Sequence, residues 1–407
     1  METKVFINST GNAAEIVRAG GLVAVPTETV YGLAANGLDA EAVQKIYDVK
    51  GRPAVKPLSL MVPGKDAIGT YLVDAPQAAF TLAEKFWPGP LTIVGKAADF
   101  IPPIVLAGGS TVGLRCPDNA LTRTALEEAG VPFAAPSANP SGEESPKDAS
   151  RVLRYFDGKI DAVIDGGKCS IGTESTLIDV STAPYRILRS GALGRNEIAD
   201  ALVEQMIVIG ISGGTGSGKS SLLHYLEKKG AFAIDCDEVY HELLAHSEEM
   251  NRALREKFPG AYPLGTFNRK ALGEIVFNDG EALDALNAIS HSYVKEEVRR
   301  MLREAAMQGK TLAAIDAIEL HSSGLAELCI ATVGVLADPK IRAQRIMRRD
   351  SISEEYANSR IRAQRTDEYF REKSNFCVEN NGTLADLIQN YENQVKAEKE
   401  KHQWKKT

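Results

Sequence analysis

The stretch Gly213-Gly214-Thr215-Gly216-Ser217-Gly218-Lys219-Ser220 decides the fold of the second half of this 407-residue chain. It matches the pattern of a phosphate-binding loop in full, including the final lysine and serine. An apolar run at residues 207–212 precedes the loop, and a helical pattern follows it. This strand–loop–helix context is the one that the motif requires, so we predict a nucleotide-binding α/β domain.

The loop predicts how a nucleoside triphosphate is bound. Its glycines let successive backbone N–H groups converge on the phosphates, and the following helix adds its positive end. We expect Lys219 to reach the β- and γ-phosphates and Ser220 to hold Mg²⁺. The ATP-binding candidates are Gly213, Gly214, Thr215, Gly216, Ser217, Gly218, Lys219, Ser220 and Ser221. The alternative is a glycine-rich turn with an accidental lysine.

The surrounding pattern predicts two domains. Apolar runs at residues 231–235, 312–316 and 331–336 alternate with long helical stretches, which indicates a parallel sheet with helices and a helical lid. A helical pattern at 196–205 separates this half from the one before it. We therefore predict one domain at residues 1–205 and a second at 206–407.

The first half predicts a different α/β architecture. Short β-branched runs at residues 21–26, 91–96, 111–115 and 176–180 indicate strands, and residues 40–47 have helical spacing. Many glycines and prolines between them mark turns. We predict a mixed α/β sheet without regular βαβ repetition.

Composition and sequence pattern argue against several classes of protein. A net charge of −7 argues against a dedicated nucleic-acid binder, so no strong DNA binding is expected. No apolar run approaches the length of a membrane span, and the N-terminus lacks a signal-peptide pattern. Five scattered cysteines argue against a disulfide scaffold and favour a cytoplasmic location. All six histidines lie at or beyond His224, so the first half has no histidine for catalysis or metal binding.

Two carboxylates, Asp235 and Asp237, follow the second predicted strand of the second half. Together with the loop, they make residues 206–395 resemble dephospho-CoA kinase. The resemblance implies that Asp237 is the general base for the ribose 3′-hydroxyl, with Asp235 as its structural partner. It also implies that Arg349, in the lid, neutralises phosphate charge and that Asn380 lies near the adenine. Helix capping by both aspartates and solvated lid arginines are the alternative interpretations.

The second half departs from that family in its presumed acceptor region. The family's Pro-Leu-Leu-Phe-Glu run is missing after Asp316, and its His-Pro pair is replaced by His291 and Ser292. A different acceptor, a nucleoside or a nucleotide, therefore stays open as an alternative.

Four segments of the first half carry a second resemblance. They are residues 26–33, 50–58, 135–142 and 172–179, with the pairs Lys50/Arg52 and Ser137/Asn139 at their centres. Residues 10–195 resemble the YrdC-like threonylcarbamoyl-AMP synthases. This family joins L-threonine and bicarbonate into a carbamate that attacks the α-phosphate of ATP, and pyrophosphate leaves. Such a reaction gathers several anions, which calls for cations and hydroxyl donors.

The resemblance assigns roles to individual residues. Lys50 and Arg52 would hold triphosphate charge, the arginine through two parallel hydrogen bonds. The other expected nucleotide-binding residues are Ser137, Asn139 and Arg189. The expected threonine-binding residues are Thr29, Tyr31, Arg115 and Ser175. Met61 stands where some members carry a histidine.

The two resemblances together predict a bifunctional enzyme that uses ATP and Mg²⁺. Its expected partners are L-threonine, bicarbonate, ATP and dephospho-CoA, with tRNA reached only through a separate transferase. Taken singly, each first-half residue also fits a solvated charge, a turn former or packing. The alternative function is a non-catalytic RNA-binding or regulatory module fused to a kinase with another acceptor.

Overall fold

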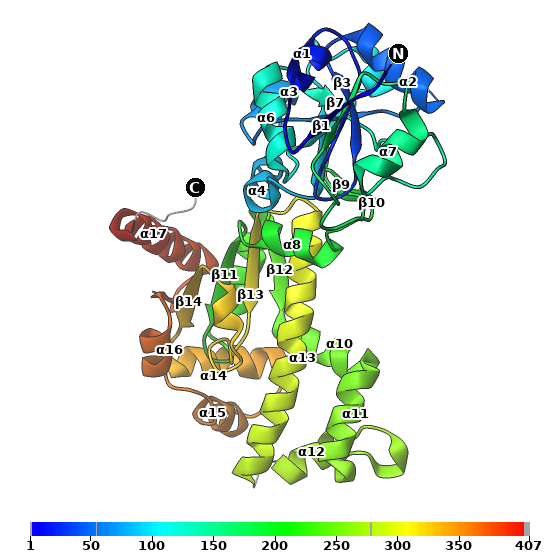
Figure 1. Cartoon of the computed structure of the whole chain (residues 1–407). Coiled ribbons are helices and arrows are strands. Elements are labelled where there is room, and N and C mark those ends of the chain that lie inside the picture. The colour runs from blue at the N-terminus through cyan, green and yellow to red at the C-terminus, as the bar shows by residue number, and fades with distance from the viewer. Residues whose placement is uncertain (1, 54, 277–278, 403–407) are drawn as a thin grey trace. The chain divides into compact units, whose positions relative to one another are not determined.

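The computed structural model describes residues 2–53, 55–276 and 279–402. The chain divides into two compact units. The first comprises the described residues up to Glu204 together with Met307–Gly309, and the second comprises the remainder. Figure 1 shows the elements of each unit.

The first unit is built on a mixed sheet, as predicted. Within the described residues, the sheet has ten strands in the order β1-β8-β2-β3-β7-β4-β6-β5-β9-β10, with parallel and antiparallel neighbours. The strands are β1 (Lys4–Ile7), β2 (Val23–Val25), β3 (Gly32–Asn36), β4 (Ser59–Met61), β5 (Leu91–Lys96), β6 (Thr111–Arg115), β7 (Phe133–Ala134), β8 (Ala162–Asp165), β9 (Thr176–Asp179) and β10 (Arg186–Arg189).

Short helices connect these strands. They are α1 (Ala13–Arg18), α2 (Ala40–Lys50), α3 (Ala67–Tyr71), α4 (Gln77–Phe86), α5 (Pro103–Leu106), α6 (Ala120–Ala129), α7 (Ala149–Phe156) and α8 (Arg195–Val203). Asp39 caps the start of α2, and Gly51 ends it with a φ of 58° in the left-handed region that glycine adopts readily. This turn follows Lys50 at once and sends the chain toward Arg52.

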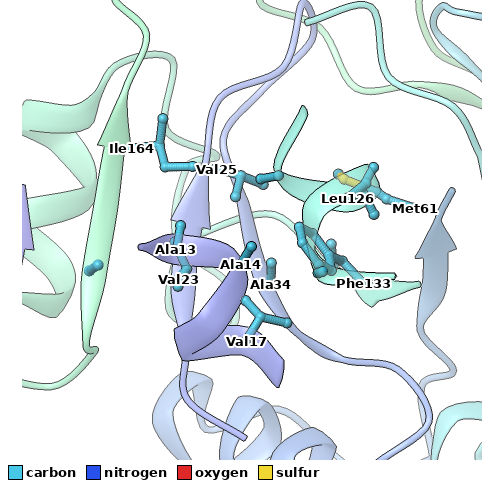
Figure 2. Packing of buried hydrophobic residues seen from close by; sticks show 14 residues of the cluster. Ala13, Ala14, Val17, Val23, Val25, Ala34, Met61, Leu126, Phe133 and Ile164 are labelled. Atoms are coloured by element: carbon cyan, nitrogen blue, oxygen red, sulfur yellow. The ribbon is translucent and has the colours of Figure 1, made fainter. Parts of the chain in front are cut away.

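The core of the first unit lies between its sheet and its helices. Figure 2 shows Val17 of α1, Val25 of β2, Leu126 of α6, Phe133 of β7 and Ile164 of β8 in one apolar cluster. All five are at most 1% exposed. Complete burial of each such side chain is worth about 1.5–3 kcal/mol, so this cluster fixes the sheet that carries the loops described below.

The second unit has the predicted parallel sheet. Five strands run in the order β12-β13-β11-β14-β15, and every neighbouring pair is parallel. They are β11 (Ile207–Ser212), β12 (Phe232–Asp235), β13 (Leu312–Asp316), β14 (Ala331–Leu336) and β15 (Phe376–Glu379). Asp316 is in register with Ile211 on one side and Asp235 on the other, so the carboxyl ends of three strands meet at one edge.

Helices surround this sheet. They are α9 (Lys219–Lys228), α10 (Cys236–His246), α11 (Glu248–Lys257), α12 (Arg269–Val276), α13 (Gly280–Met307), α14 (Pro339–Asp350), α15 (Glu354–Arg362), α16 (Asp367–Lys373) and α17 (Leu384–His402), with short 3-10 turns η1 (Pro259–Ala261), η2 (Pro263–Gly265) and η3 (Leu325–Leu328). The charged composition of residues 396–406 predicts a solvated or frayed helix end, and the part of this stretch beyond His402 lies outside the described residues.

Besides a small cluster between α14 and α15, the described residues of the second unit form two larger apolar clusters. One packs the sheet against α9 and α17 through residues such as Ile211, Leu222 and Leu387. The other, which we call the helical group, joins α10, α11, α12 and α13 around Leu254 and Tyr262. In the part of the chain that the structure describes, no helix is both long and apolar enough to span a bilayer.

Candidate functional sites

The phosphate-binding loop of the second unit follows β11 and ends where α9 begins. Gly213, Gly216 and Gly218 have φ values of 141°, 80° and 105°, which disfavour any side chain. A Cβ atom on Gly213 would overlap the carbonyl oxygen of Val335, and one on Gly218 would overlap the amide of Asn380. The loop is therefore restricted to glycine at these positions by both conformation and space.

Lys219 and Ser220, the first two residues of α9, both meet Asp316 at the end of β13. The Lys219 Nζ lies 3.8 Å from Asp316 Oδ1, and the Ser220 hydroxyl donates to Oδ2 at 3.3 Å. Burial raises the pKa of Asp316 to about 6, with Asp235 and Asp237 adding to the rise and Lys219 opposing it. A lysine, a hydroxyl and a carboxylate thus share one point beside the loop.

Asp316 was not among the residues singled out from the sequence. The signal that could have found it is a carboxylate at the end of an apolar strand, at residues 312–316. Oxygen donors from Ser220 and Asp316 suit Mg²⁺, which takes one or two protein ligands and completes its shell with water and phosphate. The residues present therefore fit the expected metal. No group of three or more potential metal ligands occurs in the described residues.

Asp235 and Asp237 have different environments. The carboxylate of Asp235 caps α10 by accepting from the backbone N–H groups of Asp237, at 2.9 Å, and Glu238, at 3.3 Å. Asp237 lies exposed in the first turn of α10, close enough to Asp316 and Arg349 to raise the pKa of each. The capping interpretation therefore describes Asp235, whereas Asp237 keeps a free carboxylate at the site.

Arg349 lies at the end of α14, where Asp350 holds it. Its Nε is 2.7 Å from Asp350 Oδ1, and Asp350 also pairs with Arg360 of α15 at 2.6 Å. These arginines lower the pKa of Asp350 to about 2, principally through the hydrogen bond from Arg349. The side chain of Arg349 is exposed, and Asp237 lies close enough to raise its pKa.

Other side chains support the loop from outside, and sequence reasoning missed them. Arg342 donates from Nε to the carbonyl of Thr215 at 3.0 Å, and Arg345 donates to the carbonyls of Gly216 and Ser217 at 3.3 Å. Gln364 accepts from the Thr215 N–H at 2.8 Å. These contacts join α14 and the segment after α15 to the loop.

Asn380, expected near the adenine, contacts the loop itself. It follows β15 directly, is buried, and donates from Nδ2 to the carbonyl of Ser217 at 2.6 Å. Of the remaining loop candidates, Gly214 and Thr215 are buried, and Ser221 is exposed in α9.

The first unit contains a cavity of about 350 Å³. Its lining includes six of the residues predicted from the sequence, and it is rich in cations and hydroxyls. These six are Tyr31, Arg52, Arg115, Ser137, Ser175 and Arg189. No histidine is among the described residues of the lining, in agreement with the sequence. The lining does not include Lys50, Asn139 or Thr29, and all three side chains are buried.

Lys50 supports the wall of this cavity. Its Nζ donates to the backbone carbonyls of Ser137 and Asn139, so the last residue of α2 ties down the loop after β7. Burial lowers the pKa of Lys50 to about 7, with Arg52 lowering it further and Glu174 raising it. The Asn139 amide donates to the carbonyls of Pro140 and Glu143, and its buried Oδ1 has no partner.

Two arginines of the lining are held by neighbouring residues. Arg52 donates from Nε to the carbonyl of Lys56 at 3.3 Å and from one amino group to that of Pro57 at 3.1 Å. Arg115, on β6, pairs with Glu28 at 2.8 Å and donates to the carbonyl of Gly89 at 3.3 Å. Glu28 lies in the first motif but was not selected as a site residue.

The remaining site residues form polar chains. Arg189 donates to both the carbonyl and the hydroxyl of Ser175, and the Ser175 hydroxyl is 2.8 Å from that of Thr92. Thr29 is buried against Thr27, with their hydroxyls 2.8 Å apart. The Tyr31 hydroxyl donates to the carbonyl of Gly167 at 2.7 Å, and burial raises its pKa. Thr92 and Glu174 are further lining residues that sequence reasoning missed.

One family model matches in each half of the chain. Residues 15–191 match the Sua5/YciO/YrdC family model, described as "Telomere recombination". Residues 207–386 match the model described as "Dephospho-CoA kinase".

Curated relatives match the first unit. The threonylcarbamoyl-AMP synthase of Pyrococcus abyssi is 44% identical over 192 residues, which are 47% of this chain and 56% of the relative. A putative threonylcarbamoyl-AMP synthase of Methanocaldococcus jannaschii is 37% identical over 180 residues, 44% of this chain and 84% of the relative. The chain spans little more than half the length of several such relatives, at 56%, 54% and 52%. The crystal structure of P. abyssi Sua5 complexed with L-threonine aligns with a TM-score of 0.48 and 29% identity, covering 80% of this chain and 95% of the other.

Proposed function

Since the chain belongs to the threonylcarbamoyl-AMP synthase family through its first unit and carries a dephospho-CoA kinase domain in its second, we propose that it is a bifunctional enzyme. The first unit forms L-threonylcarbamoyladenylate from L-threonine, bicarbonate and ATP. The second transfers the γ-phosphate of ATP to the 3′-hydroxyl of dephospho-CoA. We place both activities in the cytoplasm, with the adenylate passed to a separate transferase that modifies a tRNA adenosine.

The cavity of cations and hydroxyls is the observation that carries the first activity. Arg52 and Arg189 reach its lining from different segments and would bind the triphosphate. Arg115, oriented by Glu28, would bind the threonine carboxylate, while Ser175 and Tyr31 line the same cavity. Lys50 would act by holding the Ser137–Asn139 loop in place for the nucleotide. A fixed positive wall stabilises charge that moves from the α-phosphate to the departing pyrophosphate.

The meeting of Lys219, Ser220 and Asp316 carries the second activity. Lys219 would bind the β- and γ-phosphates, and Asp237 would accept the proton of the attacking hydroxyl. Mg²⁺, held by Ser220 and Asp316, would neutralise charge on the phosphate oxygens. Arg349 would add positive charge beside Asp237.

An acceptor screen with labelled ATP tests both proposals. The first predicts pyrophosphate release that depends on threonine and bicarbonate together. The second predicts ADP formation with dephospho-CoA. ADP formed with nucleosides or nucleotides but not with dephospho-CoA would overturn the proposal that dephospho-CoA is the acceptor. RNA binding by the first unit without adenylate formation would overturn the proposed synthase activity.

The two activities should also separate physically. Each family match ends within one half, and each unit has its own apolar clusters. We therefore expect residues 1–205 and 206–407, expressed apart, to unfold cooperatively and to retain adenylate formation and phosphotransfer respectively. Thermal unfolding and activity assays on both pieces measure this. Two insoluble or inactive pieces would contradict the boundary.

Lys50 leads to a pH prediction. The folded pKa of Lys50, about 7, lies below the ordinary lysine value of 10.5, so at pH 8 the buried amine is largely uncharged. Bound polyphosphate favours the charged form, so ATP binding to the first unit should take up a fraction of a proton, up to about one. Calorimetry of residues 1–205 in buffers with different ionisation enthalpies measures the uptake.

The control for this measurement is another lysine of the same segment. Lys50→Met should abolish the proton uptake, whereas Lys56→Met, at an exposed side chain, should retain it. The same linkage predicts that folding stability of the empty unit rises between pH 7 and about 10, because the unfolded chain binds the Lys50 proton more tightly. Equal heats in all buffers would show that Lys50 does not change its charge.

A further inference from the structure

One carboxylate belongs to the lining of the first unit's cavity. Among the described residues of the lining, Glu174 is the only acidic one. Its Oε2 lies 2.8 Å from an amino nitrogen of Arg189. It also raises the pKa of Lys50 and of Arg52, so its charge acts on these two residues as well as on Arg189.

The arginine in this pair is held by other contacts. Arg189 donates from Nε to the carbonyl of Ser175 at 3.1 Å, and from a terminal nitrogen to the same carbonyl at 2.9 Å and to the hydroxyl at 3.0 Å. The nitrogen that meets Glu174 is the remaining one. The guanidinium would therefore stay in place if Glu174 moved away, leaving that nitrogen directed at the position the carboxylate had held.

Glu174 has a fixed backbone and a movable side chain. Its carbonyl accepts from the N–H of Ala192 at 3.0 Å, and a Cβ on Gly191 would overlap the backbone of residues 174 and 175. Beyond Arg189, the side chain is held by one hydroxyl, that of Ser145, at 3.0 Å. The side chain is 39% exposed, so it can turn toward solvent without disturbing β9.

We propose that Glu174 is a counter-ion that takes the place of polyphosphate in the empty cavity and releases Arg189 when polyphosphate binds. The inference rests on the proposed function of the first unit, in that the cavity receives the phosphates of ATP. The carboxylate compensates cations that would otherwise bind any anion tightly. It therefore weakens the affinity of the cavity for pyrophosphate, the product that must leave after each turnover.

Direct binding of inorganic pyrophosphate tests the proposal. The full chain should carry Lys219→Ala throughout, because this change weakens phosphate binding at the second unit. In that background we expect Glu174→Gln, which keeps the size of the side chain and removes its charge, to bind pyrophosphate about 5- to 20-fold more tightly. The gain should shrink as ionic strength rises, because screening acts on charge and not on shape.

Two further variants separate charge from other effects. Glu174→Asp retains a carboxylate at the cavity and should stay close to the unaltered affinity. Glu144→Gln is the matched control, because Glu144 is exposed and pairs with Arg151 at 4.0 Å, away from the lining. It removes the same charge from the same unit and should leave pyrophosphate binding unchanged.

Equal or weaker pyrophosphate binding by Glu174→Gln would overturn the proposal. Pyrophosphate release by the chain with Glu174 intact is measured separately, with threonine and bicarbonate. Tighter binding by Glu174→Gln, together with no such release, would reject the synthase function and retain the counter-ion. Pyrophosphate release by the intact chain, with no gain in pyrophosphate binding by Glu174→Gln, would reject the counter-ion proposal and retain the synthase function.

Discussion

Replacing Asp237 by asparagine should lower kcat for dephospho-CoA phosphorylation by about 10²–10⁴, the usual scale of general acid–base catalysis. Asp237 stands exposed in the first turn of α10, near both Asp316 and Arg349. Its backbone N–H is bound by Asp235, which fixes the turn but leaves the carboxylate free to accept a proton. Asparagine keeps the size of the side chain and removes its basicity, so ATP affinity should change little.

Steady-state kinetics with dephospho-CoA and direct ATP binding measure the two quantities separately. Lys219→Ala should weaken ATP binding as well as turnover, because in the proposed reaction the lysine contacts phosphates before and during transfer. Glu238→Gln, an exposed change one residue from Asp237, is the matched control and should retain turnover. Asp235→Asn should act mainly on stability, because this residue caps α10. If Asp235→Asn loses turnover and Asp237→Asn does not, the base is Asp235.

Arg52→Ala should lower threonine- and bicarbonate-dependent pyrophosphate release by about 10²–10³, the cost of removing one preorganised electrostatic group. The backbone carbonyls of Lys56 and Pro57 orient its guanidinium in the cavity wall before any substrate arrives. Lysine cannot reproduce a planar pair of donors, so Arg52→Lys should recover only part of the activity.

The second unit provides an internal control for this variant. ADP formation with dephospho-CoA should be unaffected by Arg52→Ala, which separates a local loss from general misfolding. Arg154→Ala removes an exposed arginine from α7 of the same unit and should leave pyrophosphate release intact. Normal pyrophosphate release in Arg52→Ala would remove this residue from the reaction.

Local sequence patterns predicted much of this fold, but they did not predict its shortest strands. The phosphate-binding loop, its strand and its helix are consecutive in the chain, and each contributes its own signal. In the first unit, β7 comprises Phe133 and Ala134 alone, and two residues cannot display an alternating pattern. Its place between β3 and β4 is set by pairing with residues far away in sequence.

The same distinction separates the site residues that were predicted from those that were missed. Lys219 and Ser220 stand in a contiguous motif. Asp316, which contacts both, is 96 residues from Ser220 in the sequence. Gln364 contacts Thr215 although the two are 149 residues apart in the sequence, and no sequence pattern predicts that contact. Glu174 lies inside a recognised motif, but its pairing with Arg189 depends on how β9 and β10 are joined.

Helix α10 belongs to two parts of the second unit at once. Its first turn presents Asp237 beside the loop, while Tyr240, Leu243 and Leu244 pack into the helical group. The sheet and α9 have a separate cluster of their own. Over evolutionary time, the helical group can therefore change its sequence without altering the phosphate-binding loop. Sequence change in α10 would be more constrained, because a shift in its packing also displaces the carboxylate of Asp237.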